Sequence, residues 1–255
     1  MTEPTVHLYC CIGARTSPEL VRQFVAHYRN LGIESWWLFL NFAAPDEHHA
    51  PAIRYVLASF GLVATPWRGA YCEVEALARR RELIDRENRS GVWIVDVDVD
   101  EFVRFPSAVP GYLSRLEASG VDWIPGVFVD RVAEHGMLKA IDPTPLANQF
   151  PLGCHFTRDV LKAPDRKVVA AKAHVGILPG HHGVTGSHVS GEEILAVDHY
   201  KWNDSVAARM AARVASMRQG ATALDFSAEY ERALGHIMAS GHLDLTLTES
   251  YRISS

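Results

Sequence analysis

Strand-like and helix-like patterns alternate through the first hundred residues, and this alternation restricts the fold more than any other feature of the sequence. Four short apolar runs have the length of buried strands, at residues 6–12, 36–41, 62–67 and 92–99. Segments with apolar residues at helical spacing separate them, at residues 18–31, 53–60 and 70–88. Strands joined through helices form βαβ crossovers and therefore a parallel sheet covered on both faces.

A sheet of this kind also predicts where a ligand binds. Open α/β sheets bind ligands beyond the carboxyl ends of their strands. In this sequence those ends are the segments 13–15, 41–43, 67–68 and 98–101. We therefore expect Arg15 and Asn41 to lie close to the acidic residues Asp98 and Asp100.

The alternation ends after Pro106. We expect a short helix closed by Gly120, and then further elements at residues 121–129 (strand), 131–165 (loop-like), 168–177 (strand), 181–191 (polar loop), 203–219 (helix) and 227–240 (helix). No internal repeat or low-complexity linker divides the chain. We therefore expect a single domain, residues 1–255.

The composition argues against some partners. The 255 residues carry a net charge of −5 without a long basic run, so nothing points to a nucleic-acid partner. The four cysteines lack CxxC spacing, which favours reduced thiols in a cytoplasmic protein. No apolar stretch approaches the roughly 20 residues that a transmembrane helix needs.

The segment 93–102, with the sequence WIVDVDVDEF, is the most informative in the chain. Side chains of a strand alternate between its two faces, so Asp96, Asp98 and Asp100 are expected to share one face. Carboxylates in a row repel one another unless a positive group compensates them. Because carboxylate oxygens suit Mg²⁺ or Mn²⁺, the segment predicts a divalent-cation site. The alternative is an exposed edge strand with a solvated acidic face.

The same segment resembles a known signature. Its core Asp98-Val99-Asp100-Glu101-Phe102, preceded by Trp93, is similar to the W-φ-φ-x-D-φ-D-E-F pattern (φ apolar) of family 2-like glycosyltransferases. Weaker similarities extend the resemblance over residues 6–202 and include the pair His199-Tyr200. The resemblance implies a GT-A-like, Rossmann-like α/β fold, with a mixed, mostly parallel sheet, helices on both faces and additional C-terminal helices. It further implies a nucleotide-binding half (1–105), an acceptor- and metal-completing half (106–202) and C-terminal helices (203–255).

The family's activity supplies expectations for function. The resemblance implies transfer of a sugar from a nucleotide sugar, expected to be a UDP-sugar, to a hydroxyl group of a glycan or small molecule, with inversion at the sugar carbon. Mn²⁺ or Mg²⁺ is then expected on Asp98 and Asp100, with His199 or, second, His182 completing the metal shell. Residues expected to contact the nucleotide sugar are Arg15, Asn41, Asp98, Lys167 and Lys201.

An inverting transferase also needs a carboxylate that takes the proton of the acceptor hydroxyl. The sequence offers Asp130, Glu192 and Glu193 as candidates, and Glu134 as a further one. Glu192 and Glu193 follow the polar loop and precede His199, which favours them for this role.

The sequence leaves two other functions and a homodimer as alternatives. A metal-dependent nucleotidyltransferase shares the sheet and the acidic site, although Gly13-Ala14-Arg15 is a faint version of its glycine-rich loop. A non-catalytic carbohydrate- or metal-binding module would use the tryptophans to stack on sugars. The apolar faces of the C-terminal helices are expected to cover the sheet or to form a homodimer contact.

Overall fold

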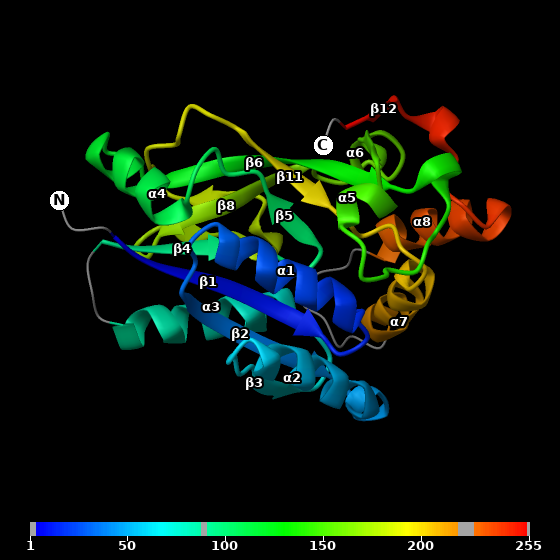
Figure 1. The fold of residues 1–255 in the computed structure, drawn as a ribbon, viewed down its shortest axis with the longest axis horizontal. Coiled ribbons are helices and arrows are strands. Elements are labelled where there is room, and N and C mark those ends of the chain that lie inside the picture. Colours follow the sequence, from blue (N-terminus) through cyan, green and yellow to red (C-terminus); the bar gives the residue numbers. More distant parts are fainter. Residues whose placement is uncertain (1–3, 88–90, 219–226, 254–255) are drawn as a thin grey trace.

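The computed structural model describes residues 4–87, 91–218 and 227–253. It contains a mixed sheet with helices on both faces and two helices near the C-terminus, α7 (Val206–Arg218) and α8 (Ser227–Ser240) (Figure 1). The predicted GT-A-like α/β fold is therefore confirmed. Asn88 and Gln219, at the ends of two predicted helices, lie outside the described residues.

The first hundred residues form the parallel part of the sheet. Its strands, in spatial order, are β3 (Thr65–Arg68), β2 (Ser35–Phe42), β1 (Thr5–Gly13) and β4 (Val92–Asp96). The connecting helices are α1 (Pro18–Asn30), α2 (Ala50–Ser59) and α3 (Glu73–Glu87). The predicted alternation of strands and helices is correct over this whole region.

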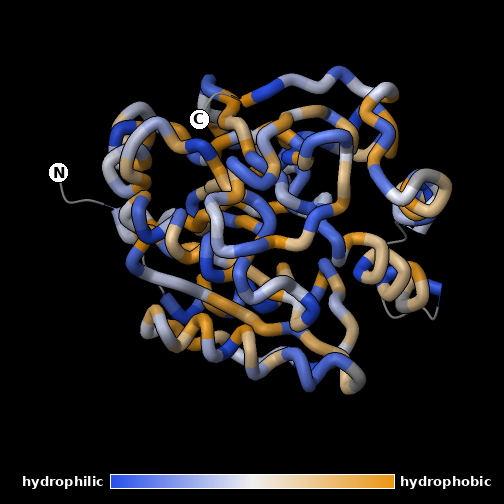
Figure 2. Tube along the Cα trace, turned by 45° about the vertical axis from the view of Figure 1, so that its right-hand side comes forward, coloured by the Kyte–Doolittle hydropathy of each residue, from blue (hydrophilic) through white to orange (hydrophobic). Residues whose placement is uncertain are grey.

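Side chains of β1 explain why both faces of the sheet are covered. Leu8, Cys10 and Ile12 pack into the core that α1 and α2 cover. Tyr9 belongs to a second cluster with Ala76 and Ile84 of α3, and its hydroxyl donates to the Ala76 carbonyl at 2.6 Å. Alternate residues thus serve opposite helix layers, as the period of a strand requires. The hydrophobic segments in Figure 2 run through the strands at the centre of the molecule.

The rest of the chain extends this sheet. The further strands of the sheet are β5 (Glu101–Val103), β6 (Trp123–Val132), β7 (Leu152–Cys154), β8 (Arg166–Lys172), β11 (Leu195–His199) and β12 (Ser250–Arg252). The helices in this part of the chain are α4 (Val109–Ala118), α5 (Leu146–Gln149) and α6 (Phe156–Asp159), besides α7 and α8. A separate two-stranded sheet pairs β9 (Gly176–Ile177) with β10 (Val184–Thr185). Strand β8 runs antiparallel to β4, whereas β11 is parallel to β6 and antiparallel to β5.

Two local predictions need correction. The acidic strand ends at Asp96, so Asp98 and Asp100 follow the strand and do not share a strand face with Asp96. The positively charged Arg80 guanidinium, not a metal ion, compensates Asp96 through two hydrogen bonds of 2.6 and 3.0 Å. The strand expected at 168–177 is divided into β8 and β9 by a turn at residues 173–175.

Helices α7 and α8 form a layer of their own. They pack on each other and share a hydrophobic cluster with Trp202 and with residues of β6 and β7. Their buried contributions to this cluster are Val206, Met210, Ala233 and Ile237. The two helices therefore lie beside the sheet end at which β6 and β11 finish (Figure 1).

Candidate functional site

A cavity of about 420 Å³ opens at the carboxyl ends of the parallel strands. Gly13 of β1, Asn41 of β2, Gly69 after β3 and Asp98 after β4 line one side of it. Residues of α7 and α8 line the opposite side, and they include Val206, Arg209, Met210, Arg213, Glu229 and Tyr230. The site thus occupies the position that an open α/β sheet favours for ligands.

The acidic turn at residues 98–101 is fixed by its own hydrogen bonds. The Glu101 N–H donates to the Asp98 carbonyl at 3.0 Å, and the Asp98 N–H donates to Glu101 Oε2 at 2.8 Å. Lys167, buried in β8, contacts the Glu101 carboxylate, and its Nζ lies 4.0 Å from Asp98 Oδ2. Burial raises the pKa of Glu101, while the Lys167 ammonium favours the charged carboxylate. The Asp98 side chain remains 52% exposed and faces the cavity.

Asp100 is held more tightly than Asp98. Its carbonyl accepts from the Tyr200 N–H at 2.7 Å, and its Oδ2 accepts from Arg209 Nη1 of α7 at 3.3 Å. Burial acts to raise the pKa of Asp100, but the charges of His199, Arg209 and Lys201 bring it below its ordinary value. Asp100 is therefore an ionised carboxylate at the edge of the cavity.

His199, at the end of β11, is oriented by a buried carboxylate. Its Nδ1 lies 3.0 Å from Asp130 Oδ1, and its ring stacks on Phe128 with 4.7 Å between centroids. Burial acts to lower the pKa of His199, but the Asp130 hydrogen bond and the charges of Asp100 and Asp130 raise it above its ordinary value. With Nδ1 engaged by Asp130, Nε2 is the nitrogen left for a ligand in the cavity, an arrangement common among metal-binding histidines.

Seven of the predicted site residues line this cavity, and they are Arg15, Asn41, Asp98, Asp100, His182, His199 and Lys201. Some are already engaged: Arg15 pairs with Asp46, and the Asn41 amide donates to the carbonyls of Trp67 and Gly69. His182 places Nδ1 2.6 Å from the Arg166 carbonyl.

The predicted metal ligands do not form a closed shell by themselves. In the described part of the chain, the one group of three or more His, Cys, Asp or Glu residues with ligand atoms within 4.8 Å of one another is elsewhere, at Asp122, His174 and His188. A cation in the cavity would therefore have few protein ligands. Mg²⁺ is usually bound in this way, by one or two carboxylates together with substrate phosphates.

The candidate bases Glu192 and Glu193 lie away from the cavity. Neither lines the cavity, and Glu193 accepts a hydrogen bond from the Tyr112 hydroxyl at 3.0 Å. Both precede β11, whose far end carries His199, and a strand advances roughly 3.3 Å per residue. The strand alone spans about 13 Å from Leu195 to His199, and Glu193 lies before it.

The burial of Asp130 and Lys167 changes the roles that the sequence predicted for them. Asp130 does not line the cavity, and four donors saturate its carboxylate: the Thr157 N–H and hydroxyl, Trp202 Nε1 and His199 Nδ1, at 2.7–3.0 Å. It therefore orients His199 and is not the base. Lys167 is buried against Glu101 and does not line the cavity, so its position is that of a support for the acidic turn.

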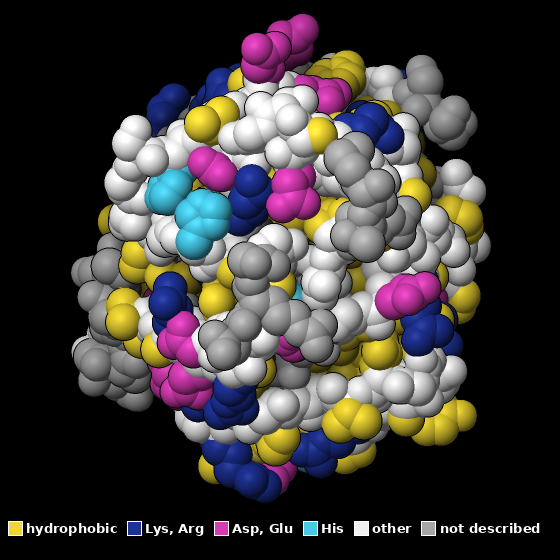
Figure 3. Space-filling model, turned by 90° about the vertical axis from the view of Figure 1, so that its left-hand side faces the viewer, with side chains coloured by type: hydrophobic (Ala, Val, Ile, Leu, Met, Phe, Trp, Pro, Cys, Tyr) yellow, Lys and Arg dark blue, Asp and Glu magenta, His cyan; other side chains and the backbone are white. Residues whose placement is uncertain are grey.

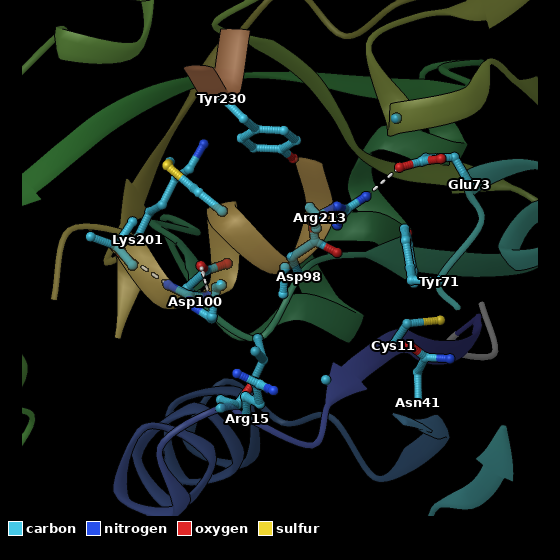
Figure 4. Close-up of a pocket in the computed structure, with 18 of the residues that line it drawn as sticks. Cys11, Arg15, Asn41, Tyr71, Glu73, Asp98, Asp100, Lys201, Arg213 and Tyr230 are labelled. Atoms are coloured by element: carbon cyan, nitrogen blue, oxygen red, sulfur yellow. Dashed lines mark hydrogen bonds and ion pairs between the residues drawn. The ribbon is translucent and has the colours of Figure 1, made fainter. Parts of the chain in front are cut away.

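Sequence reasoning missed the basic and aromatic groups of α7 and α8. Arg213 contacts the Glu73 carboxylate, and its guanidinium lies 4.6 Å from the Tyr71 ring centroid and 5.7 Å from that of Tyr230. Figure 4 shows these side chains converging on the cavity with Asp98 and Asp100. The available signal was the spacing of Arg209 and Arg213, four residues apart and hence on one helix face.

Carboxylates outnumber cationic side chains in the described lining of the cavity. The six carboxylates are Asp46, Glu73, Asp98, Asp100, Glu101 and Glu229, and the four cationic side chains are Arg15, Lys201, Arg209 and Arg213. Five of these carboxylates pair with a basic side chain, Glu101 with the buried Lys167, which leaves Asp98 as the carboxylate in excess. A cation would offset this charge when an anionic ligand such as a nucleoside diphosphate binds.

Comparison with known proteins does not assign this chain to a family. No family model matches the chain, and no curated protein sequence does. Among solved structures, 125 chains match, and one of them is the crystal structure of S. aureus TarS. That match covers 92% of this chain and 44% of TarS, with 6% sequence identity and a TM-score of 0.34. This chain therefore spans less than half the length of TarS, and the functional proposal rests on the geometry of the site.

No helix in the described parts of the chain has both the length and the apolar character needed to cross a membrane.

Proposed function

We propose that this protein is a metal-dependent glycosyltransferase that moves a sugar from a nucleotide sugar, with a UDP-sugar as the expected donor, to a hydroxyl group of a glycan or small molecule. The observation that carries the proposal is the pairing of two groups across one cavity. Asp98, Asp100 and His199 lie at the sheet end, and the arginines of α7 face them. Oxygen ligands for a cation and positive charge for a diphosphate are what such a donor requires.

The residues present fit a divalent cation. Asp100 and His199 are the proposed ligands, with Asp98 beside them, because each presents an oxygen or nitrogen atom to a cavity in which carboxylates outnumber cationic side chains. Mn²⁺ and Mg²⁺ accept such ligands. A bound cation would neutralise negative charge that develops on the departing diphosphate.

The chain's own groups divide the remaining work. The strand ends around Gly13, Asn41 and Gly69 offer the nucleoside a surface close to the backbone. Arg209 and Arg213 lie across from the acidic turn, where guanidinium groups would stabilise the leaving diphosphate. Preorganised positive charge of this kind acts most strongly in a site with little water.

Glu229 replaces the earlier candidates as the proposed base. It lines the cavity from α8, and its nearest cationic partner is Lys201, with 3.9 Å between Nζ and Oε1. In an inverting transfer, a carboxylate oxygen takes the hydroxyl proton while the hydroxyl oxygen bonds to the sugar carbon and the bond to the diphosphate breaks.

The test is a panel of nucleotide sugars incubated with the metal-free protein, with and without Mn²⁺, while free nucleoside diphosphate is measured. Slow, Mn²⁺-dependent release of UDP from a UDP-sugar without an acceptor supports the proposal, provided that Asp100→Ala and Glu229→Gln both lose it. Release of pyrophosphate from a nucleoside triphosphate and a sugar phosphate would instead indicate the nucleotidyltransferase. Sugar binding without either product would indicate a non-catalytic module.

A further inference from the structure

The group Asp122, His174 and His188 lies at the opposite end of the sheet from the cavity. Asp122 directly precedes β6, His174 lies in the turn after β8, and His188 lies in the loop between β10 and β11. The register pairs Trp93, near the start of β4, with Lys172 at the end of β8, whereas the cavity begins beyond the end of β4. None of the three residues lines the cavity.

Backbone hydrogen bonds hold the three segments together before any ligand binds. The Asp122 N–H donates to the Val189 carbonyl at 2.8 Å, and the Lys172 N–H donates to the Asp122 carbonyl at 2.9 Å. The Gly191 N–H donates to the Trp123 carbonyl at 2.8 Å. The loop and the turn that carry the histidines are thus both attached to the strand that follows Asp122.

The Asp122 carboxylate is oriented toward the histidines. The Val189 N–H donates to its Oδ2 at 3.1 Å, and its Oδ1 lies 3.6 Å from His174 Nε2. The rings of His174 and His188 are 5.6 Å apart between centroids. Ligand atoms of all three residues lie within 4.8 Å of one another. Figure 3 shows histidine side chains adjacent to one another on this face, beside charged groups of both signs.

We propose that Asp122, His174 and His188 form a second metal site, one that binds a borderline divalent transition ion such as Zn²⁺. Two imidazoles and one carboxylate are a ligand set that suits Zn²⁺, and three protein ligands leave a fourth position for water or a substrate group. The Val189 N–H is the outer hydrogen bond that fixes such a carboxylate. This site differs from the cavity, where carboxylates prevail and a harder cation is proposed.

Lys172 is the group that a metal ion would displace. Its Nζ lies 3.4 Å from Asp122 Oδ1, and the same nitrogen lies 5.7 Å from the Trp93 ring centroid. After displacement, the Lys172 ammonium would keep its contact with the Trp93 ring. The metal would therefore replace only the weak ion pair between Lys172 and Asp122. The metal would connect the turn after β8, the loop before β11 and the start of β6, and it should raise the melting temperature because it binds only the folded chain.

The experiment is a calorimetric titration of Zn²⁺ into metal-free protein that carries no polyhistidine tag. We expect saturable Zn²⁺ binding at this site, with an affinity at least about tenfold lower in His174→Ala and in His188→Ala. The reason is that loss of an outer-shell contact alone lowers metal affinity about 10- to 100-fold. Asp122→Asn keeps an oxygen for the Val189 N–H and removes the charge, and it should weaken binding without unfolding the loop. Zn²⁺ should raise the melting temperature of the wild type more than that of these variants.

Two controls separate this site from others. The double variant His48→Ala/His49→Ala removes a different pair of neighbouring histidines, both exposed, whose rings lie 3.9 Å apart, and should leave Zn²⁺ binding unchanged. Asp100→Ala removes a proposed cavity ligand and should also retain the binding, so this result does not depend on the proposed transferase activity. Absence of saturable Zn²⁺ binding, or equal affinity in wild type and His174→Ala/His188→Ala, would overturn the proposal.

Discussion

The two walls of the cavity are built in different ways. The strand-end wall holds its groups through main-chain and buried bonds: Asp98 and Glu101 bond each other's backbone, and Asp130 orients His199. The helical wall is connected to it by side-chain ion pairs, from Arg209 to Asp100 and from Arg213 to Glu73. The first wall should therefore keep its geometry whatever is bound, whereas the ion pairs of the second can be exchanged for contacts with a charged ligand.

The largest expected effect is on stability and tests the rigidity of the strand-end wall. Lys167→Met leaves the Glu101 carboxylate buried without its cation, which typically costs about 3–5 kcal/mol of unfolding free energy. Denaturant titration measures the loss. The double variant Lys167→Met/Glu101→Gln removes both charges and should recover part of it; a single variant as stable as wild type would show that the acidic turn does not depend on this pair.

The next effect is on catalysis. Asp100→Ala should lower kcat at least about 100-fold, because the loss of one electrostatic contact to the transition state costs about that much. Circular dichroism should show an unchanged fold. Glu192→Ala, which removes an exposed acid at the far end of β11, is the matched control and should retain activity. Wild-type activity in Asp100→Ala with saturating Mn²⁺ would contradict the metal assignment.

The helical wall should show a smaller effect that responds to salt. Arg213→Ala should raise KM for the nucleotide sugar by about tenfold, the equivalent of about 1.4 kcal/mol from one lost charged contact. KM is measured at low and high ionic strength, and the wild type should lose its advantage as salt increases. Arg218→Ala, an exposed arginine on the same helix, should leave KM unchanged. A salt-independent difference would argue that Arg213 acts through packing on Tyr71 instead.

The smallest effect is a pH dependence at His199. The pKa of His199 lies above the ordinary 6.5, so protonation of its imidazole already begins above pH 6.5 as the pH falls. Protons then compete with a metal for Nε2. The Mn²⁺ concentration for half-maximal activity should rise by less than about tenfold in total as pH falls from 8 to 6. His199→Gln should flatten this dependence between pH 8 and pH 6. Identical Mn²⁺ titrations for both proteins at both pH values would remove His199 from the metal site.

The strand-end wall was largely predictable from the sequence and the helical wall was not. Periodicity located β1 to β4, and parallel strands must end at one edge, so Arg15, Asn41 and Asp98 could be brought together without coordinates. The sequence next to Asp96 does not show that Arg80 binds it, because the two residues lie 16 positions apart, in α3 and β4. The alternation of acids therefore suggested a longer strand and a shared face that do not exist.

Long-range packing also determines which of the other charged residues lie at the cavity. Glu192 and Glu193 precede His199 closely in sequence, but the intervening residues form the extended strand β11, which places the glutamates far from it. Arg209 and Arg213 lie on a helix whose apolar face is clear from the sequence, yet only docking on the strand ends shows that they face Asp100 and Glu73.

The contact between Arg209 and Asp100 makes cation binding an exchange of counter-ions. A cation that binds Asp100 at Oδ2 would take the place of a guanidinium 3.3 Å away, so the measured affinity would contain the cost of releasing Arg209. The released guanidinium is then free for a second anion, the diphosphate of the donor. Cation and donor should therefore bind more tightly together than either does alone, and Arg209→Gln should strengthen binding of the cation while weakening its coupling to the donor.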